Sequence, residues 1–328
     1  TSEVRTGTIP YNISYGYDPA GNRLNKVLNG VGTSYTYDDA NRLLSAGSTT
    51  YSWNANGNLI SKTEGGVTTD FAYNFDDQLT SISGPTNLGF AYDGLGRRVS
   101  RTAAGVTTTT FYDAIRPSTE KQGATVTAHY TFGGRELVAW DDGTQYEYNM
   151  PDTFGSTRQV TNAAQAIAAT FLFDGFGNLL SQSGSAPTPF KFAGIWGYRT
   201  HGDAGLLLVG ARYYDPQVGR FITADTWLGM INDPQTLNRY VYALNNPVNV
   251  VDPTGRFTLL ALIAIAVVVA LVIAFLIWMG GIVWRWLTNP PPGQFQQNLQ
   301  QRQQLEQELQ GQLQQQIDAE LQQQHRMA

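Results

Sequence analysis

The feature that most constrains this chain is a short phrase that recurs at intervals of roughly twenty residues, as expected of a repeat architecture. The full phrase has an aromatic residue, then Asp or Asn, two variable residues, a Gly, and polar and aliphatic residues after it. The clearest copies are Tyr17–Leu24, Trp53–Ile60, Tyr92–Val99 and Phe173–Leu180, and weaker copies start at Tyr37, Tyr73 and Tyr112. We therefore expect one small structural unit to be repeated along the chain.

Each copy predicts a β-hairpin. Alternate residues of a strand point to the same face, so pairs such as Tyr15 and Tyr17 place two rings on one face. The Asp-x-x-Gly that follows is typical of a turn, and a second strand comes after it. Because one hairpin is too small to be stable alone, successive hairpins must share a continuous sheet. We expect a mainly β fold with a curled sheet of hairpins; an ordinary β-sandwich with Asp and Gly in its turns is the alternative.

Composition excludes several classes of function. The formal charge of -5 comes without a cluster or stripe of basic residues, so we expect no nucleic-acid binding. The absence of cysteine excludes disulfides and thiolate metal sites. Only His129, His201 and His325 are available for histidine triads or multi-histidine metal sites. We therefore expect neither a metal nor a cofactor.

The most distinctive stretch runs from Gly205 to Gly255. It contains GLLLVGARYYDP from residue 205, GRFITAD from residue 219, NRYVYALNNP from residue 238 and VDPTG from residue 251. Taken alone, Asp215-Pro216 and Asp252-Pro253 indicate turns, because Asp accepts backbone hydrogen bonds there and Pro fixes the next φ.

These motifs carry a resemblance. The repeated phrase resembles the YD repeat of bacterial Rhs proteins, of toxin-complex C components and of teneurins, and the stretch from residue 205 to 255 resembles the Rhs repeat-associated core domain. Together they cover nearly all of residues 11–256. The resemblance implies that the repeats wind into a hollow shell and that this chain is its C-terminal part.

The resemblance also implies self-cleavage, because the core of related proteins acts once on its own chain as an aspartyl-type peptidase. It implies catalytic roles for Arg212, Asp225 and Asp252, and a cut at the Arg256–Phe257 bond. Two neighbouring carboxylates repel, so one keeps its proton and the pair can serve as acid and base, while a guanidinium orients one of them. This sequence has Thr226 where related proteins commonly have Pro, and Arg256 where they commonly have Leu.

A long apolar segment follows the core. No charged residue occurs between Phe257 and Trp284. About twenty helical residues span about 30 Å, the thickness of a bilayer's hydrocarbon core. Trp278, Trp284 and Trp286 gather at one end, as in an interfacial belt. We predict a transmembrane-type α-helix over residues 257–287 that binds the lipid membrane; a helix or strand pair buried within the shell is the alternative.

The last part of the chain is rich in proline and then in glutamine. Its apolar residues, spaced mostly four apart, are Phe295, Leu299, Leu305, Leu309, Leu313, Ile317 and Leu321. This spacing favours an amphipathic helix that could self-associate. Disorder of the Gln-rich tail is the alternative.

We therefore divide the chain into a YD-repeat shell segment (1–190), a core domain (191–256), the transmembrane-type helix (257–287) and a Pro linker with Gln-rich tail (288–328). The predicted function is that of an Rhs polymorphic toxin whose shell encapsulates a membrane-inserting or pore-forming effector, released by the cut after Arg256. No other enzymatic activity is expected. The alternative is an uncut, membrane-anchored structural or adhesive protein of the cell surface.

Both interpretations predict a secreted or cell-surface protein that is membrane-associated through its C-terminal segment. The partners expected on the toxin interpretation, besides the membrane, are a secretion-system or toxin-complex component and an immunity protein.

Overall fold

The computed structural model describes residues 2–6, 9–134, 136–256, 259–288 and 292–326. The chain divides into two compact units, Thr1–Leu262 and Ile263–Ala328, and each is described by itself. The first unit contains all the β-structure, and the second contains helical residues. The four-part division expected from the sequence stays a prediction.

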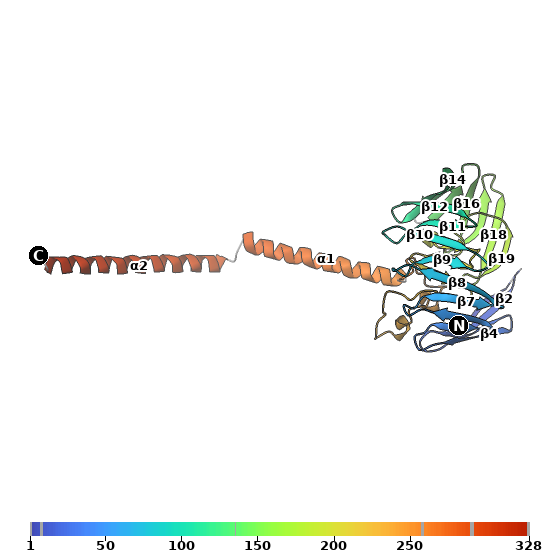
Figure 1. The fold of residues 1–328 in the computed structure, drawn as a ribbon. Coiled ribbons are helices and arrows are strands. Elements are labelled where there is room, and N and C mark those ends of the chain that lie inside the picture. The colour runs from blue at the N-terminus through green and yellow to red at the C-terminus, as the bar shows by residue number, and fades with distance from the viewer. Residues whose placement is uncertain (1, 7–8, 135, 257–258, 289–291, 327–328) are drawn as a thin grey trace. The chain divides into compact units, whose positions relative to one another are not determined.

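One antiparallel sheet of 19 strands accounts for most of the first unit (Figure 1). Strands β1 to β9 are Ser2–Arg5, Tyr11–Tyr17, Arg23–Leu28, Val31–Tyr37, Leu43–Ala46, Thr49–Trp53, Leu59–Glu64, Val67–Tyr73 and Leu79–Ser83. Strands β10 to β19 are Leu88–Tyr92, Arg98–Ala103, Val106–Asp113, Arg116–Gln122, Thr125–Gly133, Glu136–Asp141, Tyr146–Pro151, Thr157–Asn162, Ile167–Phe173 and Leu179–Gly184. Each strand pairs with the next in the sequence, so the sheet is one continuous meander of hairpins. The mainly β prediction is confirmed.

The turn predicted from Asp-x-x-Gly forms in successive repeats with one hydrogen-bond pattern. In the first, Asp18 Oδ1 accepts the backbone N–H of Asn22 at 2.8 Å, and Gly21 N–H donates to the Asp18 carbonyl at 3.1 Å. Gly21 has a φ of 79°, which favours glycine. The same side-chain cap recurs at Asp38, Asn54, Asn74, Asp93, Asp152, Asn162 and Asp174.

In five of the repeats, the aromatic residue before the turn ties its hairpin to the preceding one. The Tyr73 hydroxyl donates to the Leu59 carbonyl at 2.9 Å, and the Tyr92 hydroxyl donates to the Leu79 carbonyl at 2.8 Å. Three further links of this kind join the Tyr37 hydroxyl to the Arg23 carbonyl, the Trp53 indole N–H to the Leu43 carbonyl, and the Tyr112 hydroxyl to the Arg98 carbonyl. The aromatic residue two positions earlier, such as Phe71 or Phe90, packs in the core. The repeated phrase therefore encodes both a turn and a link between hairpins.

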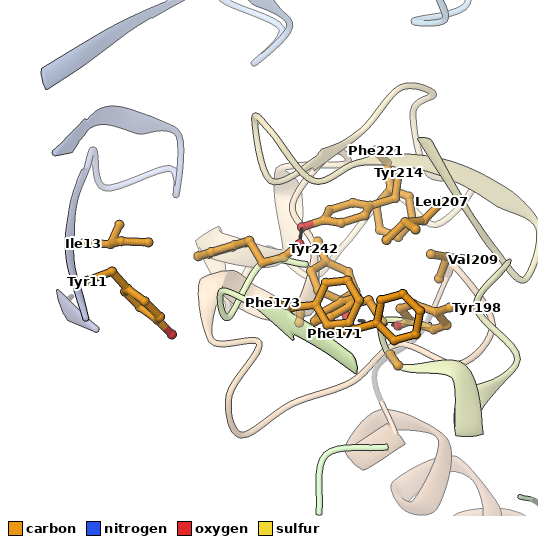
Figure 2. Close-up of a cluster of buried hydrophobic side chains, with 14 of the residues drawn as sticks. Tyr11, Ile13, Phe171, Phe173, Tyr198, Leu207, Val209, Tyr214, Phe221 and Tyr242 are labelled. Carbon is orange, nitrogen blue, oxygen red and sulfur yellow. Dashed lines mark hydrogen bonds between the residues drawn. The ribbon is translucent and has the colours of Figure 1, made fainter. Parts of the chain in front are cut away.

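The sheet curls until the strands near its beginning pack against those near its end. Strand register shifts immediately before the repeat's aromatic residue, as at Gly16/Tyr17 and Ala72/Tyr73, and such bulges bend a sheet. The side chains of β2 and β18 pack in one buried cluster, shown in Figure 2 by Tyr11, Ile13, Phe171 and Phe173. The backbone N–H of Gly175, after β18, donates to the Glu3 carboxylate of β1 at 2.9 Å.

The core region forms a second, four-stranded antiparallel sheet and short 3₁₀ turns. The elements are β20 (Arg199–His201), β21 (Leu206–Val209), β22 (Arg212–Asp215), β23 (Arg220–Phe221), η1 (Gly194–Trp196), η2 (Pro234–Leu237) and η3 (Ala243–Asn245). Every residue of β21, β22 and β23 is buried, because this sheet fills the space enclosed by the curled one.

Side chains of the core bind the turns of the first repeats. The Arg220 guanidinium donates to the Asn22 side chain at 3.2 Å and to the Asn41 carbonyl at 2.7 Å. The Asn245 amide donates to the Gly21 carbonyl at 2.9 Å. The Tyr240 hydroxyl donates to Gly57 in the third turn at 3.0 Å. Repeats and core are thus a single packed unit, which fixes the position of the residues that follow β22.

Two helices follow the core, α1 (Leu259–Thr288) and α2 (Pro292–Arg326). The Gln-rich tail is therefore helical, as one of the two alternatives predicted. Pro292 is the first residue of this helix, a position at which a backbone N–H would have no acceptor within the helix. The transmembrane prediction for residues 257–287 is not supported. In the part of the chain that the structure describes, no helix combines the length and the apolar character needed to cross a membrane.

Candidate active site

The candidate site lies where the end of the core packs against the turn between β21 and β22. The backbone N–H of Ala211 donates to the Thr254 carbonyl at 3.0 Å. Gly210 and Gly255 have φ angles of 51° and 68°, and a Cβ on either would collide with backbone atoms of the other segment. Glycine is therefore required at both positions, and this close approach seats residues 252–256 beside the first residue of β22.

Arg212 brings the two predicted aspartates together. Its Nη2 lies 2.7 Å from Asp225 Oδ2 and 3.9 Å from Asp252 Oδ2. The three residues are only 7, 6 and 4 % exposed, respectively. One buried guanidinium nitrogen is thus within ion-pairing distance of both carboxylates, although the three residues come from separate parts of the sequence.

The other donors of Arg212 hold the backbone around the site. Its Nε donates to the Gly255 carbonyl, and its Nη1 donates to the Arg239 carbonyl at 2.9 Å. Its central carbon lies 3.7 Å from the centroid of the Phe221 ring, so the cation also makes a cation–π contact. Together these contacts orient the side chain.

Both aspartates combine turn chemistry with the contact to Arg212. Asp225 Oδ1 accepts the backbone N–H of Trp227 at 2.9 Å. Asp252 Oδ1 accepts the backbone N–H groups of Thr254 and Arg256, each at 3.2 Å. In both residues the second oxygen, Oδ2, faces Arg212. Each aspartate therefore stabilises its turn with one carboxylate oxygen and faces Arg212 with the other.

Tyr198 fixes the backbone of Asp252. Its hydroxyl donates to the Asp252 carbonyl at 2.8 Å and accepts the Asp252 N–H at 3.2 Å. The hydroxyl of Tyr242 lies 3.1 Å away, and both rings belong to the buried cluster in Figure 2. Asp252 is consequently positioned from its backbone side as well as through its carboxylate.

The amide between Gly255 and Arg256 is held at both ends. Its carbonyl accepts a hydrogen bond from Arg212, and its N–H donates to Asp252. The predicted scissile bond, Arg256–Phe257, begins one residue further on. Phe257 lies outside the described residues, so the structure describes this bond only on its Arg256 side.

Burial changes the acid–base properties of the site. It raises the pKa of Asp252 to about 6, against the opposing influence of Arg212 and of the hydrogen bonds from Thr254 and Arg256. Burial also lowers the pKa of Arg212 to about 10, against the influence of the two carboxylates, so the guanidinium stays charged near neutrality. An acid that titrates near pH 6 beside an ion-paired carboxylate is suited to proton transfer.

Sequence reasoning did not single out Tyr198, Arg239 or Phe221 as parts of this site. Tyr198 precedes the distinctive stretch and carries no motif, while Arg239 and Phe221 stand inside it without any spacing that relates them to Arg212. Among the described residues, no group of three or more His, Asp or Glu side chains is arranged to hold a metal ion.

Comparison with known proteins identifies relatives that match about half of this chain. The chain is 30% identical over 174 residues to the tRNA3(Ser)-specific nuclease WapA of Bacillus spizizenii, which covers 51% of this chain and 7% of that protein. It is 32% identical over 152 residues to salivary gland surface protein 1 of Aedes aegypti, which covers 46% of this chain and 4% of that protein. The chain thus spans only a small part of the length of the relatives it matches.

A solved structure of the Photorhabdus luminescens Tc holotoxin pore is similar over 75% of this chain and 17% of that chain, with a TM-score of 0.45 and 17% sequence identity. The family model of the teneurin YD-shell matches residues 3–248, which is well over half of the 328 residues and includes Arg212 and Asp225. The curled sheet of YD-repeat hairpins and this match lead to one conclusion: the chain belongs to the teneurin YD-shell family.

Proposed function

We propose that this chain is the C-terminal part of a self-cleaving toxin shell, in which Arg212, Asp225 and Asp252 cut the Arg256–Phe257 bond. The observation that carries the proposal is that one buried guanidinium nitrogen lies within ion-pairing distance of both aspartates. The same guanidinium binds the carbonyl of Gly255, next to the bond to be cut.

The chemistry is the addition of one water molecule across an amide. Asp225, ion-paired with Arg212, accepts a proton from water, and the water oxygen adds to the carbonyl carbon of Arg256. Asp252 donates its proton to the nitrogen of Phe257 as the carbon–nitrogen bond breaks. The products are a carboxylate at Arg256 and an amine at Phe257, so water is the only other reactant. Burial supports this division, because it favours the protonated form of Asp252.

The released part would be residues 257–328. Two of the similar proteins support the toxin class, because WapA is named as a tRNA nuclease and the Photorhabdus structure is that of a holotoxin. Only the toxin class is taken from these names. The segment after Arg256 is the released part, and no membrane-crossing role is assigned to it.

Intact-mass spectrometry of the purified chain tests the proposal. The parent is compared with Asp225→Asn and Asp252→Asn, and with Asp215→Asn as the matched control. Asp215 is also a buried aspartate in an Asp-Pro turn, and its Oδ1 accepts the N–H of Gln217, a bond that Asn retains.

We expect a fragment ending at Arg256 in the parent and in the control, and only the full-length mass in the two site variants. A fragment ending at Gly255 would show that the bond cut is the Gly255–Arg256 amide, which Arg212 and Asp252 bind. A single uncut mass in all four proteins would refute self-cleavage and favour a structural surface protein, the class to which the name of the Aedes relative points.

A further inference from the structure

A cavity separate from the aspartates lies between the large sheet and β20. The cavity has a volume of about 380 Å³. Its walls come from β11 to β15 of the large sheet and from the segment that contains β20, and they include Arg98, Arg101, Arg199, Thr108 and His201. Neither the repeats nor the self-cleavage mechanism requires three arginines at this place.

The cationic side chains of the cavity outnumber its carboxylates. Arg199 pairs with Glu120, and Arg101 pairs with Asp203. Arg98 is only 3 % exposed, and among the described residues no carboxylate lies within ion-pairing distance of it. One guanidinium charge is therefore buried here without a counter-charge, which is costly unless a ligand supplies one.

The neighbours of Arg98 do not supply that charge. Its Nη1 donates to the Tyr213 hydroxyl at 3.2 Å and contacts Nε2 of His201. Burial, reinforced by the charges of Arg98 and Arg199, lowers the pKa of His201 well below its usual range. His201 is therefore neutral near pH 7 and accepts from Arg98 without compensating its charge.

Several donors of the three arginines are buried without an acceptor. Among the described residues no hydrogen-bond partner is present for Nε of Arg98, Nε of Arg101, or Nε and Nη1 of Arg199. A buried donor without an acceptor costs about 1–3 kcal/mol, so native proteins rarely leave four in one place. The cavity thus combines an uncompensated positive charge with unused donors.

We propose that this cavity binds a small oxyanion, a phosphate or a carboxylate group, between Arg98, Arg101 and Arg199. The planar guanidinium matches both groups, because it can give two parallel hydrogen bonds to two oxygens of the same anion. Such a ligand supplies the missing negative charge and accepts the unused donors together. Ordered water can accept the donors, but it cannot supply the charge.

The strand β12 offers a matched pair of variants for the test. Thr108 lines the cavity, and its neighbour Thr109 does not. Successive residues of a strand point to opposite faces, so Thr108→Glu places a carboxylate in the cavity while Thr109→Glu places it on the other face. Both threonines are only half-buried, and neither belongs to the aspartate site. The two variants have the same composition and net charge.

The experiment is isothermal titration calorimetry of the full chain with inorganic phosphate and, separately, with acetate, both at constant ionic strength. We expect saturable binding of at least one anion to the parent and to Thr109→Glu, and at least tenfold weaker binding to Thr108→Glu and to Arg98→Gln. Comparison of the two titrations identifies which anion is preferred. Absence of saturable binding to the parent, or equal binding by Thr108→Glu and Thr109→Glu, would overturn the proposal.

Discussion

The guanidinium of Arg212 lies over the ring of Phe221, with its central carbon 3.7 Å from the ring centroid. The face of an aromatic ring is apolar but carries partial negative charge, so it attracts the buried cation. It leaves the edge of the guanidinium free to reach Asp225, Gly255 and the Arg239 carbonyl. Phe221 therefore determines how Arg212 is presented to the aspartates.

Replacing Phe221 with Leu should weaken both the fold and the site. We expect a loss of about 2 kcal/mol in the free energy of unfolding, from the cation–π contact and the smaller side chain. We also expect slower self-cleavage, because Arg212 loses the surface that orients it. Urea denaturation measures the first effect, and the time course of fragment formation measures the second. Cleavage at the parental rate would show that Arg212 needs no such support.

Arg212→Met should be more damaging than any change at the ring. It leaves two buried carboxylates without their shared cation, and breaking a buried ion pair in this way typically costs about 3–5 kcal/mol. Fragment formation should stop. Arg212→Lys keeps the charge but lacks the planar set of donors, so it should fold better than Arg212→Met and still cut poorly. Equal cleavage by Arg212→Lys and the parent would show that only the charge matters.

Self-cleavage should slow as the pH rises. Burial raises the pKa of Asp252 to about 6, and the proposed mechanism uses its protonated form. Below about pH 6 most Asp252 is protonated, and above it the protonated fraction falls about tenfold per pH unit. We expect the rate of fragment formation, measured by quenched mass spectrometry between pH 5 and 8, to fall in that way. A rate that rises over this range would remove Asp252 from the role of acid.

The repeat phrase was sufficient to predict the class of fold. Aromatic residues at alternating positions and Asp-x-x-Gly turns, read at Tyr17, Tyr92 and Phe173, correspond to hairpins that form one meander. The link from the aromatic residue of five repeats to the preceding hairpin was not predicted. Its partner is a backbone carbonyl 10 to 14 residues earlier. Every residue has a backbone carbonyl, so the sequence does not indicate which one is the acceptor.

The candidate site was predicted only through a resemblance. Nothing in the spacing of Arg212, Asp225 and Asp252 indicates that they meet, because their proximity depends on Gly210 and Gly255 allowing two backbone segments to touch. Tyr198 could not be predicted at all, since its hydroxyl binds backbone atoms of Asp252. The membrane prediction was made from a run of apolar residues, and among the described residues no helix is long and apolar enough to support it.

His201 should make the stability of the first unit depend on pH. Burial lowers its pKa in the folded state well below 6.5, whereas the unfolded chain has the ordinary value. Between these values the unfolded state binds more protons, so stability rises with pH and is lost as pH falls below about 6.5. The slope from this one group is at most about 1.4 kcal/mol per pH unit. Urea denaturation at several pH values should show a steeper dependence for the parent than for His201→Gln; equal slopes would contradict a buried, neutral His201.

The hydroxyl links between hairpins should each contribute measurably to stability. Tyr73→Phe or Tyr92→Phe leaves the ring in place but removes the hydrogen bond to the Leu59 or Leu79 carbonyl, at a cost of about 1 kcal/mol. Tyr146→Phe is the matched control, because that side chain is 51 % exposed and its loss should cost less than about 0.5 kcal/mol. If Tyr73→Phe and Tyr92→Phe are no less stable than Tyr146→Phe in urea denaturation, the aromatic residue of the repeat acts through packing of its ring alone.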